Sequence, residues 1–183
     1  MSKPDIPFDV SYSMPDGGRA VATAPDEMRR AVAWLEDQAE ITEDQHTRAR
    51  LLALAGGYAG MVGELPRAHD LLQRAIELAD SIGATRQALV ARIRLADVTA
   101  SRGQPLDAAS RLSDLLDHHR LDCQQHGVDD AVHQHLGKAL LEAGEPARAV
   151  THLQQALELR RARGDEELLA STLAALEAAR RQL

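Results

Sequence analysis

Apolar side chains recur at helical spacing along most of the chain. Residues 66–78 and 146–159 both contain the pattern R-A-x-x-x-L-Q-x-A-[IL]-E-L, whose alanines and first leucine fall at i, i+4 and i+7 on one helix face. Similar faces, separated by turn signals, predict helices near residues 25–40, 43–62, 66–82, 85–102, 105–125, 129–143, 146–163 and 165–181. We therefore expect an all-α protein of about eight helices with no sheet.

Glycine and proline mark a repeat. Gly63, Gly103 and Gly144 each precede a proline by two or three residues, and they stand 40 and then 41 residues apart. A glycine can end one helix, and a proline at the first helical position can open the next. Seven positions before each glycine stands a small residue, where two antiparallel helices can cross closely: Gly56, Ala96 and Gly137. Helix pairs at this spacing predict a solenoid, in which each pair packs on its neighbours.

The same signals divide the chain into an arm and a helical domain. We expect an extended N-terminal arm at residues 1–24 and a repeat domain at 25–183. Within that domain we expect repeats near 43–83, 85–127 and 129–164, with half-repeats at 25–40 and 165–181. Thr42 and Gln45 have the spacing of a capping box for the helix at 43–62.

The repeat resembles the tetratricopeptide repeat family. The residues that carry the resemblance lie between about 45 and 164: Gly56, Gly63, Ala68, Leu72 and Ala75; Ala96, Gly103, Ala108 and Leu112; Gly137, Gly144, Ala149, Leu153 and Ala156. The usual aromatics of the first helix are mostly missing, and the period exceeds the family's usual length of about 34 residues. The chain is thus similar to the longer-helix variants. The resemblance implies a right-handed α-α superhelix that binds proteins or peptides.

The resemblance also implies which residues line a concave groove, because in this family the first helix of each pair faces inward. The expected row is Arg50, Ala53, Gly57, Gly60 and Met61; Val90, Ile93, Asp97 and Ala100; Gln134, Lys138 and Leu141. The lysine/asparagine clamp by which some members bind a chaperone's terminal carboxylate is absent from this row. Its small and apolar residues favour a peptide that carries apolar side chains. Gly57 and Gly60 would let such a ligand approach the backbone, although a merely loose helix would also explain them.

The N-terminal arm alternates with a period of two. Its apolar residues are separated by Pro7, Asp9, Ser11 and Ser13: Ile6, Phe8, Val10, Tyr12 and Met14. An extended backbone places all five on one face. We expect this face to contact an apolar surface, in the protein's own groove or in a second subunit, with Gly17 and Gly18 freeing the arm from the helices. The alternative is a disordered tail that happens to alternate.

Composition restricts the classes of function. The formal net charge is −7, only four residues are aromatic, and no cluster of lysine and arginine is flanked by aromatics, so a nucleic-acid partner is not expected. The single cysteine, Cys123, excludes an intramolecular disulfide. No apolar run reaches the ~18 residues that a membrane span needs. We expect a soluble, cytoplasmic protein without a membrane partner.

A histidine-rich segment at 118–135 is the candidate for metal chemistry. His119, Cys123 and His126 stand at i, i+4 and i+7, and one helix face could bring them to a zinc ion. Three further histidines lie nearby in the sequence: His118, His133 and His135. The alternative, which we favour, is a set of exposed polar residues around a buried thiol, on a helix that runs to Gly127. We accordingly expect no metal, no cofactor and no catalytic residue.

The most consistent hypothesis is a non-enzymatic scaffold, an adaptor or regulator that binds a protein or peptide in the concave groove. One alternative is a self-associating structural protein whose arm fills a groove in cis or in a homodimer. A second is a metal-binding sensor or enzyme that uses the segment at 118–135.

Overall fold

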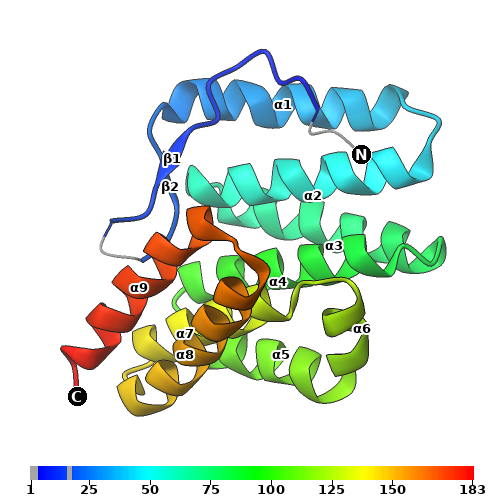
Figure 1. The fold of residues 1–183 in the computed structure, drawn as a ribbon. Coiled ribbons are helices and arrows are strands. Elements are labelled where there is room, and N and C mark those ends of the chain that lie inside the picture. Colours follow the sequence, from blue (N-terminus) through cyan, green and yellow to red (C-terminus); the bar gives the residue numbers. More distant parts are fainter. Residues whose placement is uncertain (1–3, 16–17) are drawn as a thin grey trace. The chain divides into compact units, whose positions relative to one another are not determined.

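The computed structural model describes residues 4–15 and 18–183, without the side chain of Glu167. Helices account for most of this part of the chain (Figure 1). In chain order the elements are β1 (Tyr12–Ser13), β2 (Val21–Ala22), α1 (Pro25–Ile41), α2 (Gln45–Met61), α3 (Leu65–Ser81), α4 (Thr85–Ser101), α5 (Pro105–His118), α6 (Arg120–Gln125), α7 (Asp129–Glu142), α8 (Pro146–Arg163) and α9 (Glu166–Arg180). The all-α prediction is confirmed, with consecutive helices packed as in a helical repeat.

One expected helix is divided in two. The stretch expected as a single helix at 105–125 forms α5 and α6, so the described residues contain nine helices instead of about eight. The break lies at His119, whose φ of −122° and ψ of 22° leave the helical region. Its N–H still donates to the carbonyl oxygen of Leu115 at 3.0 Å, so the chain bends and then continues helically.

The expectation that there is no sheet is wrong. β1 and β2 form a two-stranded antiparallel ladder in which Tyr12 pairs with Ala22 and Ser13 with Val21. The N–H of Thr23 extends the pairing by donating to the carbonyl oxygen of Ser11 at 3.1 Å. The alternating arm favours an extended backbone, and a second extended segment satisfies its hydrogen bonds.

The chain divides into two compact units. Unit 1 comprises Met1–Ser13 and Ala20–Ala91, and unit 2 comprises Met14–Arg19 and Arg92–Leu183, so the boundary falls within α4. In unit 1, α2 packs between α1 and α3 and also contacts β2. In unit 2, α7 packs on both α5 and α8, and α9 contacts α8 and α7. The connection from β1 to β2 therefore belongs to unit 2 except for Ala20.

The turns between paired helices depend on glycine in the left-handed conformation. Gly63, between α2 and α3, has a φ of 80°, and Gly144, between α7 and α8, has a φ of 78°. Other L residues adopt this conformation only with strain. Both positions are repeat markers in the sequence, and the structure confirms their role as turns.

Close helix crossing at Gly56 and Gly137 is also confirmed. A Cβ added to Gly56 would lie 2.6 Å from Cγ of Leu72 and 3.2 Å from the carbonyl oxygen of Ala68. A Cβ added to Gly137 would lie at the same two distances from Cγ of Leu153 and the carbonyl oxygen of Ala149. Each glycine forms the floor of a hole that one leucine of the following helix fills.

The capping box expected at Thr42 and Gln45 does not form. α2 begins at Gln45 and its N-cap is Asp44, which accepts a hydrogen bond from the N–H of Thr47 at 3.0 Å. Thr42 instead ends α1. Aspartate is as good an N-cap as threonine, and Asp44 stands two residues closer to Thr47, whose N–H needs an acceptor.

Candidate functional site

The inner row expected in unit 1 consists of small and partly buried residues. Ala53 is buried, with 4% of its surface exposed. The others are half-buried: Arg50, Gly57, Gly60, Met61 and Val90. This part of the row presents backbone and apolar surface, as the sequence predicts, and its assignment to a groove stays a prediction.

The inner row expected in unit 2 is mostly covered. Ile93, Ala100 and Gln134 are buried, with 4%, 5% and 2% of their surface exposed. The remaining three are half-buried: Asp97, Lys138 and Leu141. The expected row is therefore not an open floor here, and part of it is in contact with the segment Met14–Arg19, which belongs to the same unit.

Lys138 on α7 binds this segment through its backbone. Its Nζ donates a hydrogen bond to the carbonyl oxygen of Gly18 at 2.9 Å and lies 3.8 Å from Sδ of Met14. Burial lowers the pKa of the Lys138 ammonium, and the negative charges of Asp97 and Glu142 oppose this shift. The carbonyl of Gly18 thus supplies an acceptor to an ammonium group that is largely removed from water.

Arg19 anchors the other end of the segment. Its Nε donates to Oε1 of Glu142 at 2.8 Å, and its Nη2 donates both to Oε2 of the same carboxylate and to the carbonyl oxygen of Ala100, the latter at 2.8 Å. Glu142 is the last residue of α7, and Ala100 stands one residue before the end of α4. Two helix C-termini therefore hold one guanidinium group.

Two further polar groups lie on this row. Nδ1 of His135 lies 2.7 Å from Oδ1 of Asp97, so the imidazole is held by the carboxylate. The side-chain amide of Gln134 is buried, and neither its nitrogen nor its oxygen has a hydrogen-bond partner among the described residues. A buried amide without a partner costs about 1–3 kcal/mol. We name the set Ala100, Gln134, Lys138 and Glu142 the segment site.

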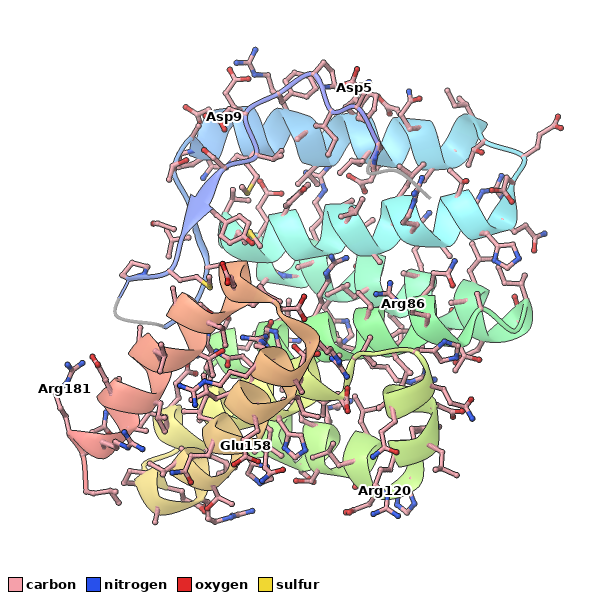
Figure 2. The ribbon with its side chains drawn as sticks, viewed as in Figure 1. Asp5, Asp9, Arg86, Arg120, Glu158 and Arg181 are labelled. Atoms are coloured by element: carbon pink, nitrogen blue, oxygen red, sulfur yellow. The ribbon has the colours of Figure 1, made fainter. Side chains whose placement is uncertain are left out.

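The arm shows the expected alternation in its burial. Ile6, Phe8, Val10 and Met14 are half-buried, whereas the alternating polar residues are exposed, among them Asp9, which is labelled with Asp5 in Figure 2. The arm runs across α1 (Figure 1), where the guanidinium carbon of Arg30 lies 5.7 Å from the centre of the Phe8 ring.

Two residues of the arm differ from the expectation. Tyr12 was expected on the apolar face, but its side chain is 49% exposed, because the ladder with β2 fixes its backbone. Gly18 was expected to free the arm from the helices, but its carbonyl is bound by Lys138. Its neighbour Gly17 lies outside the described residues.

The structure does not bring the histidine-rich segment together as a metal site. Cys123 is fully buried, and burial, with help from Asp129 and Asp122, raises the pKa of its thiol to about 11. Nδ1 of His119 lies 3.4 Å from Oδ2 of Asp122, and His126 follows the end of α6. No group of three or more potential ligands is present in the described part of the chain. The expectation that the protein binds no metal stays a prediction.

A histidine pair that the sequence did not predict joins α7 and α8. Nδ1 of His133 and Nδ1 of His152 lie 3.0 Å apart, and their ring centres are separated by 5.3 Å. The nitrogens therefore lie close to the line between the ring centres, which is the geometry of a direct N–H···N hydrogen bond. Burial lowers the pKa of both imidazoles.

A pocket of about 390 Å³ opens beside His133, away from the segment site. Its wall includes Cys123 and Arg120, the latter labelled in Figure 2 on α6. The other residues that line it come from α5 to α8: Leu116, Asp117, Gln124, Asp129, Gln155 and Leu159. The raised pKa keeps the Cys123 thiol protonated near neutral pH, so Cys123 is not activated as a nucleophile in this pocket.

A buried ion cluster, also missed in the sequence, joins α7, α8 and α9. Nε of Arg160 donates to Oδ2 of Asp130 at 2.8 Å, and its Nη1 donates to the hydroxyl of Thr172. Arg163 binds both Asp129 and Asp130. The signal was available, because paired aspartates begin one helix and arginines at i and i+3 end the next, and antiparallel neighbours bring these ends together.

Neither a family model nor a curated protein matches the chain. Among the described residues, no helix is both long enough and apolar enough to cross a membrane. The evidence for function is therefore the geometry of the sites themselves.

Proposed function

We propose that this protein is a non-enzymatic scaffold that binds an extended segment of a protein or peptide on the inner face of its helical repeats. The observation that carries the proposal is the contact between the segment site and Met14–Arg19. Lys138 donates to a backbone carbonyl and lies beside the sulfur of Met14, while Glu142 and Ala100 hold a guanidinium group. These are the three kinds of contact by which a groove holds a peptide.

The contact with the backbone gives the site a general affinity for extended chains. Lys138 donates to a main-chain carbonyl, which every segment offers, so this contact does not depend on sequence. The partly desolvated ammonium requires an acceptor, and losing the segment would leave Lys138 to find another one. A partner segment can supply the same carbonyl.

A binding role fits the contact between Glu142 and Arg19. The Glu142 carboxylate is paired with the Arg19 guanidinium, while Oδ1 of Asp97 lies 2.7 Å from Nδ1 of His135. The pair with Arg19 fixes the position of a segment and needs no proton transfer. The resemblance to tetratricopeptide repeats supports the same role, since members of that family bind proteins and peptides.

The unit 1 row extends the proposal to partner side chains. Gly57 and Gly60 are half-buried and leave backbone accessible on α2. Within unit 1 taken by itself, a ligand on this face would contact small residues and accessible backbone.

The test is a binding measurement in trans. The receptor is the full chain with Arg19→Ala, which weakens the hold on its own segment, and the probe is a fluorescent peptide of residues 12–21. We expect saturable binding by anisotropy, at least tenfold weaker when Lys138→Met is added to the receptor. Arg111→Met, which removes a positive charge from an exposed position on α5, is the matched control and should leave binding unchanged.

Absence of binding to a receptor that is folded, as judged by circular dichroism, would contradict the proposal. Equal binding to the Lys138→Met receptor would show that the peptide uses another surface. Arm exchange between two copies, the self-association alternative, would appear as a concentration-dependent dimer in sedimentation.

A further inference from the structure

We infer that the segment site contains an arginine-selective subsite, and that the partner it takes is an extended segment in which a small residue precedes an arginine. The inference rests on the proposed function and names the chemistry of the partner. Its evidence is the way in which the protein holds its own Gly18 and Arg19.

The geometry around Arg19 fits a guanidinium group and no other cation. Glu142 accepts from Nε and Nη2 through its two oxygens, and the carbonyl oxygen of Ala100 accepts from the same Nη2 at 2.8 Å. This arrangement uses the planar fork of an arginine in a fixed orientation. A lysine ammonium is a single point and cannot bind both carboxylate oxygens and the carbonyl along these directions.

The position of the subsite strengthens its preference for a cation. Ala100 lies in the last turn of α4, which ends at Ser101, so the carbonyl that accepts from Arg19 belongs to the negative end of a helix dipole, and Glu142 is the last residue of α7. The carbonyl of Ala100 also accepts from the N–H of Gly103 at 2.9 Å, and its second lone pair serves Arg19. The bound arginine itself shows that the two helix ends act as a site.

Charge balance points to the same occupant. The Glu142 carboxylate is paired with the Arg19 guanidinium, and without Arg19 it loses this cationic partner. A segment with one arginine supplies the partner again, whereas an acidic segment would place a like charge beside Glu142.

The residue before the arginine is restricted by its backbone. A Cβ added to Gly18 would lie 3.1 Å from the carbonyl oxygen of Pro15, whose oxygen accepts from the N–H of Gly18 at 2.8 Å. With its N–H bonded to Pro15, Gly18 directs its carbonyl at Lys138 while Arg19 reaches Glu142. A small residue at this position is therefore part of the motif.

Another arginine can replace Arg19 in the subsite without unfolding of the helices. The side chains of Arg19 and Glu142 are 41% and 31% exposed, so a second arginine can approach the carboxylate from solvent. The protein's own segment competes with an effective concentration in the range of about 1 mM, which lowers the apparent affinity of any partner. The intramolecular contact thus keeps the subsite occupied until a partner with further contacts displaces it.

The experiment compares three peptides of residues 12–21 on the full-length Arg19→Ala receptor, with arginine, lysine or citrulline at position 19. We expect the lysine and citrulline peptides to bind at least tenfold more weakly than the arginine peptide. Adding Glu142→Gln to the receptor should remove most of this discrimination. Adding Glu145→Gln, at an exposed ion pair with Arg148 just beyond α7, should preserve it.

The outcomes separate the inference from the proposed function. If all three peptides bind with equal affinity, the segment site stands and the arginine subsite is wrong. If discrimination survives in Glu142→Gln, the selective group lies elsewhere and the inference is also wrong. If no peptide binds to the folded receptor at any concentration reached, both the proposed function and the inference fail.

Discussion

The helix pairs α2–α3 and α7–α8 lie in different units and share one packing arrangement. In each pair a leucine of the second helix fills a hole over a glycine of the first, Leu72 over Gly56 and Leu153 over Gly137. A Cβ added to either glycine would lie 2.6 Å from Cγ of that leucine. Each pair then turns at a left-handed glycine. The middle repeat has Ala96 at the position of the glycine, and it is buried as well.

The inner faces of the same two pairs differ. α2 presents small residues such as Gly57 and Gly60, whereas α7 presents Gln134, Lys138 and Glu142. In unit 2 the chain's own segment occupies that face. Packing positions are thus repeated because both pairs meet the same steric requirement, whereas inner-face positions are free to differ because they do not carry that packing.

The largest expected effect comes from the buried ion cluster, which is specific to unit 2. Asp130→Asn leaves the buried Arg160 without its carboxylate, and we expect a loss of about 3–5 kcal/mol in the free energy of unfolding. Urea denaturation followed by circular dichroism measures this loss.

The matched control is Asp26→Asn in unit 1, where Asp26 is 93% exposed in its pair with Arg29. Exposed pairs contribute about 0–1 kcal/mol, so this change should have little effect. Equal losses in the two variants would mean that the cluster does not hold α7, α8 and α9 together.

The shared packing predicts that replacing the crossing glycine with alanine lowers the stability of both pairs by similar amounts. Gly56→Ala and Gly137→Ala each place a methyl group against Cγ of a buried leucine. Overpacking of this kind costs about 1–3 kcal/mol, which outweighs the ~1 kcal/mol by which alanine favours a helix over glycine. We expect both variants to be destabilised by similar amounts in thermal or urea unfolding.

The leucine supplies the control for this prediction. In a Leu72→Ala background the clash with Leu72 is gone and only the 3.2 Å contact with the carbonyl oxygen of Ala68 remains, so Gly56→Ala should be clearly less destabilising. If Gly56→Ala destabilises as much with Leu72→Ala as without it, the clash is not with this side chain.

On the inner face of unit 1, glycine-to-alanine substitution should increase stability instead of lowering it. Alanine at Gly57 and Gly60 together should raise the free energy of unfolding by up to ~2 kcal/mol, because alanine favours the helix and restricts the unfolded chain. Leucine at either position should leave the fold intact, because a side chain on this face enters no core. Thermal melts measure these effects, and unfolding of both leucine variants would show that the glycines serve packing instead.

The histidine pair predicts a smaller, pH-dependent effect in unit 2. Burial lowers the pKa of His133 and His152 below their ordinary 6.5, so between the folded and unfolded pKa values the unfolded chain binds more protons. The contribution to stability is therefore full above pH 6.5 and is lost as the pH falls from there toward the folded pKa values. Urea denaturation between pH 5 and 8 should show this slope, and His152→Gln should flatten it.

The exposed His69 of unit 1 is the control for the pH prediction. His69→Gln should keep the slope. A wild-type stability that is flat or rises toward low pH would show that the two imidazoles are not held neutral.

The helices and their packing could be predicted from the sequence because their signals are local. Glycine, proline and the spacing of apolar residues mark the helix ends, and the crossing at Gly56 follows from the repeat itself. The break at His119 could not be predicted, since histidine is neither a helix breaker nor a turn residue.

The segment site was only partly predictable. Gln134 and Lys138 were expected on the inner face, but Glu142 and Arg19 were not, because their ion pair joins residues 123 positions apart and neither belongs to a recognisable motif. The arm's alternation indicated an extended backbone without indicating its partner. Pairing between distant segments depends on the folded backbone, which no local pattern encodes.

The most direct test of the segment site is the rate at which trypsin cuts the bond between Arg19 and Ala20 in the intact protein. Trypsin must bind the arginine side chain, which Glu142 and Ala100 hold in the folded chain. We expect slow cleavage in the wild type, at least tenfold faster cleavage in Glu142→Gln and Lys138→Met, and no change in Arg111→Met. Cleavage of the wild type as fast as that of a free peptide of residues 12–21, or the same rate in all four proteins, would contradict the account.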